Sequence, residues 1–142
     1  KLIHRAELVA VCTPEYIEQY GYLTDPADID DHQIIVVLRD HGEIINRTNI
    51  VHNETQQITT ININHTLATN NFMHNLELVE TGKFIAVFYV SAVEKAINEG
   101  KYIRVLPDYS FEKLDFYMLK RVQDDPKINA FGDFIEECLV GL

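Results

Sequence analysis

The sequence predicts an α/β fold with three layers, in which a mostly parallel sheet lies between helices. Short apolar runs without alternation, such as residues 34–38 and 84–90, are typical of strands that are covered on both faces. From residue 58 to residue 106 strand and helix signals alternate, and this order calls for right-handed crossovers between parallel strands. The 142 residues suit one domain, and 46% of them are apolar, which is enough for a packed core.

Capping residues mark the elements of the first half. Residues 6–11 form an apolar run that predicts a buried strand. Thr13-Pro14 opens a helix, because threonine caps helices and proline suits their first position, and Gly21 ends it. Asp25-Pro26 repeats this start signal for one short helical turn. Strands are predicted at residues 34–38 and 58–64, with a weaker signal near residues 50–51.

The second half continues with alternating elements. Thr69 or Asn70 can cap a helix with apolar residues at helical spacing, and Ser91 can cap the next one. The apolar positions of the first of these helices are Phe72, Met73, Leu76 and Val79. Strands are predicted at residues 84–90, 102–106 and 114–119. Asp125-Pro126 opens the last helix, whose apolar stripe consists of Ile128, Phe131, Phe134, Ile135, Cys138 and Leu139.

The composition argues against a nucleic-acid surface and against a membrane span. The formal net charge is −10, and such a surface repels phosphate backbones, while no cluster of Lys and Arg offsets it. No apolar run reaches the length of a membrane-spanning helix, and the first residues carry no signal-peptide pattern. We therefore expect a cytoplasmic protein without membrane contact, in which Cys12 and Cys138 are reduced core thiols.

Ionisable residues form no recognisable catalytic set. The acidic group at residues 25–31 lies in a proline-containing turn, where capping and solvation explain it better than acid–base chemistry. No Gly-rich phosphate loop and no nucleophile motif is present. Six histidines occur without any tight grouping, namely His4, His32, His41, His52, His65 and His74. The sequence thus predicts no enzyme activity, no metal site and no cofactor.

Three junctions between a strand and a helix are candidates for a ligand site. They lie at residues 12–13, 68–70 and 88–91, and each offers backbone N–H groups with a hydroxyl, amide or aromatic side chain. In an open α/β sheet, ligands bind beyond the C-terminal ends of the strands, where helix N-termini favour anions. Plain helix capping uses the same residue types and is the alternative interpretation.

Five segments, in order and with matching spacing, resemble the effector-binding domain of LysR-type transcriptional regulators. Gly21 follows the first segment and His32 the second, as in the family pattern. The departures are Lys83 in place of a second glycine, Phe88-Tyr89 in place of Leu-Pro, and a poor match over residues 39–66. The segments are residues 8–17 (LVAVCTPEYI), 25–29 (DPADI), 78–87 (LVETGKFIAV), 99–109 (EGKYIRVLPDY) and 126–135 (PKINAFGDFI).

The resemblance implies a lobe of a periplasmic-binding-protein type 2-like fold, in which two α/β lobes are joined by two crossover strands. Residues 1–11 would contain the first crossover strand, and residues 12–112 would form the second lobe. Residues 113–142 would supply the return strand and the C-terminal helix of a first lobe that is otherwise largely missing. The helix-turn-helix domain that contacts DNA in this family would also lie outside this sequence.

The resemblance also implies a function. A small-molecule effector bound between the lobes would stabilise one lobe arrangement and so change how the DNA-binding domains of a dimer or tetramer are spaced. Thr69 and Asn70 correspond to the inter-lobe loop, Phe88 and Tyr89 to the second pocket loop, and Thr13 to the crossover. These five residues are the predicted ligand-binding residues.

Two other functions use the same scaffold. A lobe of a solute-binding protein for transport would carry an export signal in its full gene, and an enzyme would need a clustered catalytic set. A further expectation concerns association. If the first lobe is missing, the apolar faces of Val9, Val11, Phe131 and Phe134 lose their partners, which predicts a dimer or higher oligomer in solution.

Overall fold

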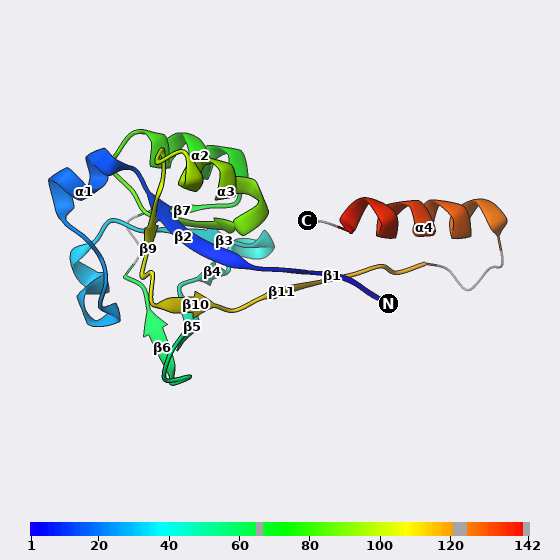
Figure 1. The fold of residues 1–142 in the computed structure, drawn as a ribbon, viewed down its shortest axis with the longest axis horizontal. Coiled ribbons are helices and arrows are strands. Elements are labelled where there is room, and N and C mark those ends of the chain that lie inside the picture. The colour runs from blue at the N-terminus through cyan, green and yellow to red at the C-terminus, as the bar shows by residue number, and fades with distance from the viewer. Residues whose placement is uncertain (65–66, 121–124, 141–142) are drawn as a thin grey trace.

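The computed structural model describes residues 1–64, 67–120 and 125–140. Its centre is formed by two three-stranded sheets that meet at a parallel bridge between Ile34 and Ile85 (Figure 1). One sheet has the order β8 (Ala86–Tyr89), β2 (Leu8–Cys12) and β9 (Ile103–Val105). The other has the order β4 (Ile44–Ile45), β3 (Ile35–Leu38) and β7 (Leu67–Thr69), and the short helix η2 (Asp40–Gly42) precedes β4.

The predicted α/β class is confirmed. The directions of the strands show which of them run parallel and which do not. Strand β3 runs parallel to β7, and the Ile34–Ile85 bridge gives β8 the same direction. Strand β2 runs antiparallel to both of its neighbours, β8 and β9. No helix joins β2 directly to either neighbour in sequence, so the crossover rule that fixes the direction of β7, β8 and β9 does not apply to it.

Two apolar clusters fill the space on either side of this centre. Helices α2 (Phe72–Glu80) and α3 (Val90–Asn98) lie together on one side, where they cover Val9, Val11 and Phe88 (Figure 1). Helix α1 (Pro14–Tyr20) and the 3-10 helix η1 (Pro26–Asp31) contribute to the other cluster, which contains Tyr16 and Ile29. This second cluster is completed by an antiparallel sheet of β10 (Tyr109–Phe111), β5 (Arg47–His52) and β6 (Ile58–Asn62).

The assignment of residues 58–64 to the parallel series was wrong. Strand β6 pairs antiparallel with β5, and β7 takes its place in the alternation β7–α2–β8–α3–β9. A strand rich in Ile and Thr can pair with a parallel or an antiparallel neighbour, because β propensity reflects how well a residue fits a half-buried pleated surface and does not specify the partner strand. The outer layer opposite α2 and α3 is therefore partly β-sheet.

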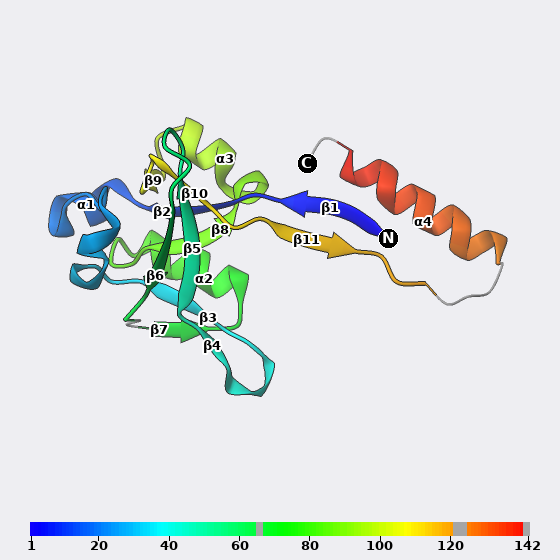
Figure 2. The same ribbon diagram turned by 90° about the horizontal axis from the view of Figure 1, so that it is seen from below.

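A two-stranded ribbon and the last helix extend from this body. Strand β1 (Leu2–Ala6) pairs antiparallel with β11 (Leu114–Tyr117), and α4 (Pro126–Leu139) lies beside the ribbon, away from α2 and α3 (Figure 2). The Lys1 Nζ atom lies 2.6 Å from a carboxylate oxygen of Glu136. The predicted stripe of α4 is mostly solvent-exposed, with Phe131 63% and Phe134 58% exposed. Val9 and Val11, in contrast, are buried, so the expectation that they lose their partners was wrong.

Capping residues were predicted with mixed success. Thr13, Asp25 and Asp125 each cap a helix, as expected. The cap of α2 is Asn71, whose side chain accepts hydrogen bonds from the N–H groups of Met73 and His74, and α3 begins after Tyr89 without a side-chain cap. The shift arises because β7 continues through Thr69, which a capping pattern alone does not reveal. Cys12 is buried, whereas Cys138 is exposed and is not a core thiol.

Tyr16 and His32 form a buried polar contact beside α1. The Tyr16 hydroxyl accepts a hydrogen bond from the Gln33 backbone N–H at 3.1 Å and lies 2.9 Å from His32 Nδ1. With Gln33 as the donor on one side, the hydroxyl donates its own hydrogen to Nδ1, which requires a neutral imidazole. Burial lowers the pKa of His32, although Asp31 and Asp28 partly oppose this shift.

Acid is therefore expected to destabilise the folded chain at pH values higher than those at which carboxylates titrate. The folded-state pKa of His32 lies below 6.5, so the unfolded state takes up the proton first as the pH falls. The stability that neutral His32 contributes is present above about pH 6.5 and is lost as the pH falls through the folded-state pKa. Urea unfolding at several pH values between neutrality and pH 5 should show this loss. It should disappear in His32→Gln and persist in His41→Gln, which changes an exposed histidine.

Candidate functional site

A cavity of about 280 Å³ opens where β3, β7 and β8 end. Thr69 and Tyr89 are the last residues of β7 and β8, and Val37 lies near the end of β3. Leu8 at the start of β2 and Leu114 at the start of β11 complete the wall at the base of the ribbon. The C-terminal ends of parallel strands thus converge on one cavity, as ligand sites of open α/β sheets do.

The polar side of the cavity surrounds the N-terminus of α2. Asn71 caps the helix, with 2.9 Å between its Oδ1 and the Met73 N–H nitrogen. The Thr69 hydroxyl donates a hydrogen bond to Oδ1 of Asn75, a residue that is 93% buried one helical turn after the cap. Asn70 lies between Thr69 and the cap and also lines the cavity. Sequence reasoning missed Asn71 and Asn75; an asparagine among apolar helix positions was the available signal for Asn75.

Aromatic residues also line the cavity. The ring of Phe72 meets Phe88 edge to face, with centroids 5.2 Å apart, and stacks near Tyr89 with centroids 6.2 Å apart. Tyr89 in turn lies 5.9 Å from Phe116 of β11, so the aromatic chain continues from the body to the ribbon. Phe88 is almost fully buried, whereas Tyr89 is half-buried. Tyr89 and Phe72, which are both half-buried, are therefore the aromatic residues that are best placed to contact a bound molecule.

Four of the five predicted site residues meet at this cavity, and Thr13 does not. Thr69, Asn70, Phe88 and Tyr89 line the cavity. Thr13 is buried at the start of α1, where its side chain caps the helix and lies next to the backbone at Gly82. For Thr13 the capping interpretation therefore describes the geometry.

Comparisons with known proteins identify the family. Residues 1–139 match the family described as LysR substrate binding domain. The chain belongs to this family. It is 30% identical over 134 residues to the probable HTH-type transcriptional regulator SinR of Salmonella typhimurium, with 92% of the chain and 42% of that protein covered. An uncharacterized HTH-type transcriptional regulator of Haemophilus influenzae is 23% identical over 107 residues, with 75% of the chain and 36% of that protein covered. The LysR domain described here thus spans less than half the length of these curated relatives.

Solved LysR regulators share the fold. The full-length virulence activator AphB of Vibrio cholerae superposes with a TM-score of 0.80 at 17% identity, covering 97% of this chain and 46% of AphB. The regulatory domain of AphB from Vibrio vulnificus superposes with a TM-score of 0.73 at 20% identity, which covers 97% of this chain and 67% of that domain. The CrgA regulatory domain from Neisseria meningitidis superposes with a TM-score of 0.68 at 19% identity, which covers 98% of this chain and 67% of that domain. About a third of each of these regulatory domains therefore has no counterpart in residues 1–142.

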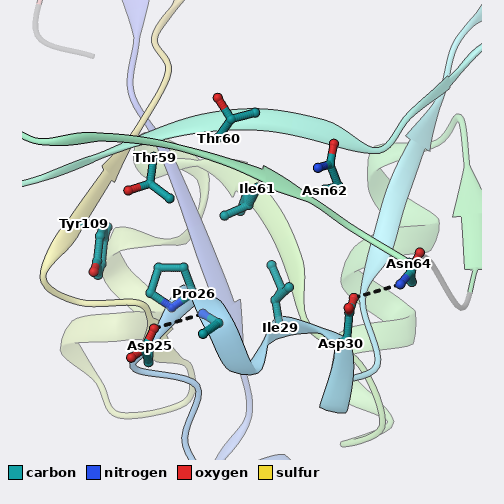
Figure 3. A pocket seen from close by; sticks show the side chains of 11 residues that line it. Asp25, Pro26, Ile29, Asp30, Thr59, Thr60, Ile61, Asn62, Asn64 and Tyr109 are labelled. Atoms are coloured by element: carbon teal, nitrogen blue, oxygen red, sulfur yellow. Dashed lines mark hydrogen bonds between the residues drawn. The ribbon is translucent and has the colours of Figure 1, made fainter.

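A larger cavity of about 480 Å³ lies elsewhere on the LysR domain, between η1 and β6 (Figure 3). Its acidic side chains are already paired, because Asp25 accepts from the Ala27 N–H at 2.9 Å and Asp30 from Asn64 Nδ2 at 3.0 Å. Thr59 and Ile61 of β6 point towards Pro26 and Ile29 across this space. Its lining does not include the strand ends of β3, β7 and β8, which makes it the weaker candidate.

Within residues 1–64, 67–120 and 125–140, no group of three or more His, Cys, Asp or Glu side chains could hold a metal ion. His65, one of the six histidines, lies outside these residues. Burial raises the pKa of the Cys12 thiol to about 12, so this thiol stays protonated and unreactive. None of the helices in the described ranges combines the length and the apolar character that a membrane span requires.

Proposed function

We propose that this chain is the effector-sensing part of a LysR-type transcriptional regulator. The cavity at the ends of β7 and β8 binds a small molecule, and a helix-turn-helix domain in another part of the protein contacts DNA in response. The observation that carries this proposal is the meeting of Thr69, Asn70, Phe88 and Tyr89 at one strand-end cavity. The net charge of −10 agrees with a domain that does not itself bind DNA. Regulation of transcription in a bacterium would place the protein in the cytoplasm.

In this proposal the β1–β11 ribbon is the connection between two lobes. Residues 12–112, together with β2, form one lobe, the ribbon of β1 and β11 leaves it, and α4 belongs with the other lobe. The antiparallel pairing of β1 with β11 supports this division, because both strands leave the body at the same point. The unmatched third of the AphB and CrgA regulatory domains supports the same division.

A ligand in the cavity would contact both the body and the ribbon. Thr69 and Tyr89 belong to the body, whereas Leu114 belongs to β11. A ligand can shift a conformational equilibrium only through differential contacts with its two states. Contacts across this boundary would change if the ribbon bent relative to the body, so they would couple binding to the position of the other lobe. This is a hinge mechanism.

A lobe of a solute-binding protein for transport remains the structural alternative, because it would use the same scaffold. The relatives and structures named above are transcriptional regulators, and nothing in the cavity favours a transported solute over an effector. The regulator interpretation therefore takes precedence.

The proposal predicts that metabolites which bind will do so through the Thr69 cavity. A metabolite library screened by thermal shift should yield ligands that raise the melting temperature of the chain. Thr69→Val removes the hydroxyl at nearly constant volume and should reduce the shift. Thr59→Val makes the same change at the η1–β6 cavity and should leave the shift unaltered. A ligand whose effect is lost in Thr59→Val and kept in Thr69→Val would contradict the assignment.

We also infer that the chain is a homo-oligomer, with α4 in the interface. Phe131 and Phe134 are more than half exposed on one side of α4, and exposed apolar patches of this kind mark association surfaces. Light scattering at micromolar concentration should therefore give a dimer or larger species. Phe131→Glu combined with Phe134→Glu should give a monomer, whereas Tyr22→Glu, at an exposed residue of the body, should not change the mass. A monomeric unaltered chain would contradict this expectation.

A further inference from the structure

Asn75 presents an unusual combination of burial and free hydrogen-bonding capacity. The residue is only 7% exposed and shares the buried side of α2 with Val79. Its Oδ1 atom accepts the Thr69 hydroxyl, but its Nδ2 atom has no hydrogen-bond partner within the described ranges. Every fully enclosed side-chain N or O atom in that part of the chain has a partner, so Nδ2 is not fully enclosed, and Asn75 lines the cavity. We take this amide donor to face the cavity.

The other walls of the cavity are largely apolar. Leu8, Val37, Val87 and Leu114 line the cavity, and the lining contains neither Lys nor Arg. The N-terminus of α2, which has nine residues, adds partial positive charge at the same side of the cavity. Moving an amide donor out of water without an acceptor is costly, so a molecule that fills this cavity must supply one. A molecule without an acceptor would leave Nδ2 unpaired.

We propose that Asn75 determines the ligand specificity of this cavity and selects a small molecule with an apolar, preferably aromatic, body and one oxygen acceptor. This inference rests on the proposed function, because it concerns the same cavity. The acceptor receives the hydrogen bond from Nδ2, and the body lies against Tyr89 and the aliphatic walls. Thr69 is a positioning residue: its hydroxyl occupies Oδ1 and so fixes which end of the amide faces the ligand. A carboxylate and a neutral carbonyl share the required acceptor chemistry.

Titration of the ¹⁵N-labelled chain with benzamide, benzoate and toluene tests this specificity. The three probes share a ring and differ in having a neutral acceptor, a charged acceptor or none. Benzamide or benzoate should shift the Asn75 side-chain NH₂ signals, and toluene should bind about tenfold more weakly, which is the effect of one hydrogen bond to a buried group. Tighter binding of benzoate than benzamide would assign the acceptor to an anion and show the contribution of the α2 N-terminus; the reverse would assign it to a neutral carbonyl.

Asn75→Leu supplies the matched variant, because it replaces the amide by an apolar group of similar size. It should invert the preference, so that toluene binds more tightly than benzamide, and a purely structural role of Asn75 would not produce an inversion. If the variant does not fold, the NH₂ shifts of the unaltered chain still decide the question. Shifts at Thr69 and Tyr89 without movement of the Asn75 NH₂ signals, or equal affinity for toluene and benzamide, would overturn the inference and leave the proposed site intact. Shifts confined to other regions, or none at millimolar concentration, would overturn both.

Discussion

Replacing Gly82 by alanine is expected to lower the free energy of unfolding by about 2–4 kcal/mol. Gly82 follows the C-terminal end of α2 with a φ of +74°, a left-handed conformation in which a side chain costs about 1–2 kcal/mol. An added Cβ would also lie 3.2 Å from Cβ of Glu15 and 3.6 Å from Oγ1 of Thr13. The clash would therefore fall on the first turn of α1, where Thr13 caps the helix. Relieving it requires the packing of α1 against the end of α2 to move.

Gly100→Ala separates the two causes. Gly100 has the same φ of +74°, but nothing lies within 4 Å of an added Cβ. This variant should lose only the conformational part, about 1–2 kcal/mol. Urea unfolding of both variants measures the difference directly. Equal losses in the two variants would show that the contact with α1 is not close in solution.

Tyr16→Phe is expected to destabilise the chain by about 1–3 kcal/mol, the typical cost of leaving buried polar groups without partners. The lost hydroxyl serves two groups, the Gln33 N–H and Nδ1 of His32, and both lie between α1 and the start of β3. The apolar contacts of the ring are retained, so the loss reports the hydrogen bonds. Removing the hydroxyl should also change the acid sensitivity described for His32, because the neutral imidazole loses its donor.

Tyr20→Phe is the control for this prediction. Its ring lies 4.6 Å from the ring of Tyr16, in the same apolar cluster, but Tyr20 is only partly buried. Removing that hydroxyl should change the free energy of unfolding by less than about 0.5 kcal/mol. Equal effects of the two substitutions in urea unfolding would mean that the Tyr16–His32 contact contributes little.

Local chemistry explains what the sequence could predict of the fold. Thr13-Pro14, Asp25-Pro26 and Asp125-Pro126 each place a helix start correctly, because capping and the fixed φ of proline act within a few residues. The direction of β2 and the partner of β6 depend instead on contacts far apart in sequence. For the same reason the sequence predicts a helix cap at Thr69, where the short strand β7 ends.

The candidate site shows the same difference between local signals, which the sequence reveals, and tertiary contacts, which it does not. Thr69, Asn70, Phe88 and Tyr89 follow from the rule that ligands gather at strand ends, together with the LysR resemblance. Asn75 was missed because an asparagine among apolar helix positions is only a weak signal, and its burial beside Thr69 depends on the tertiary structure. Thr13 is predicted from its strand-to-helix junction and from the crossover of the LysR resemblance, and its side chain caps α1.

The proposed function requires that a small molecule binds in the cavity at the ends of β7 and β8. Chemical-shift mapping of the ¹⁵N-labelled chain with a metabolite that raises its melting temperature tests this most directly. We expect the largest backbone shifts at Thr69, Asn70 and Tyr89, with smaller shifts along β11. Largest shifts at Asp30 and Thr59, around the η1–β6 cavity, would contradict it.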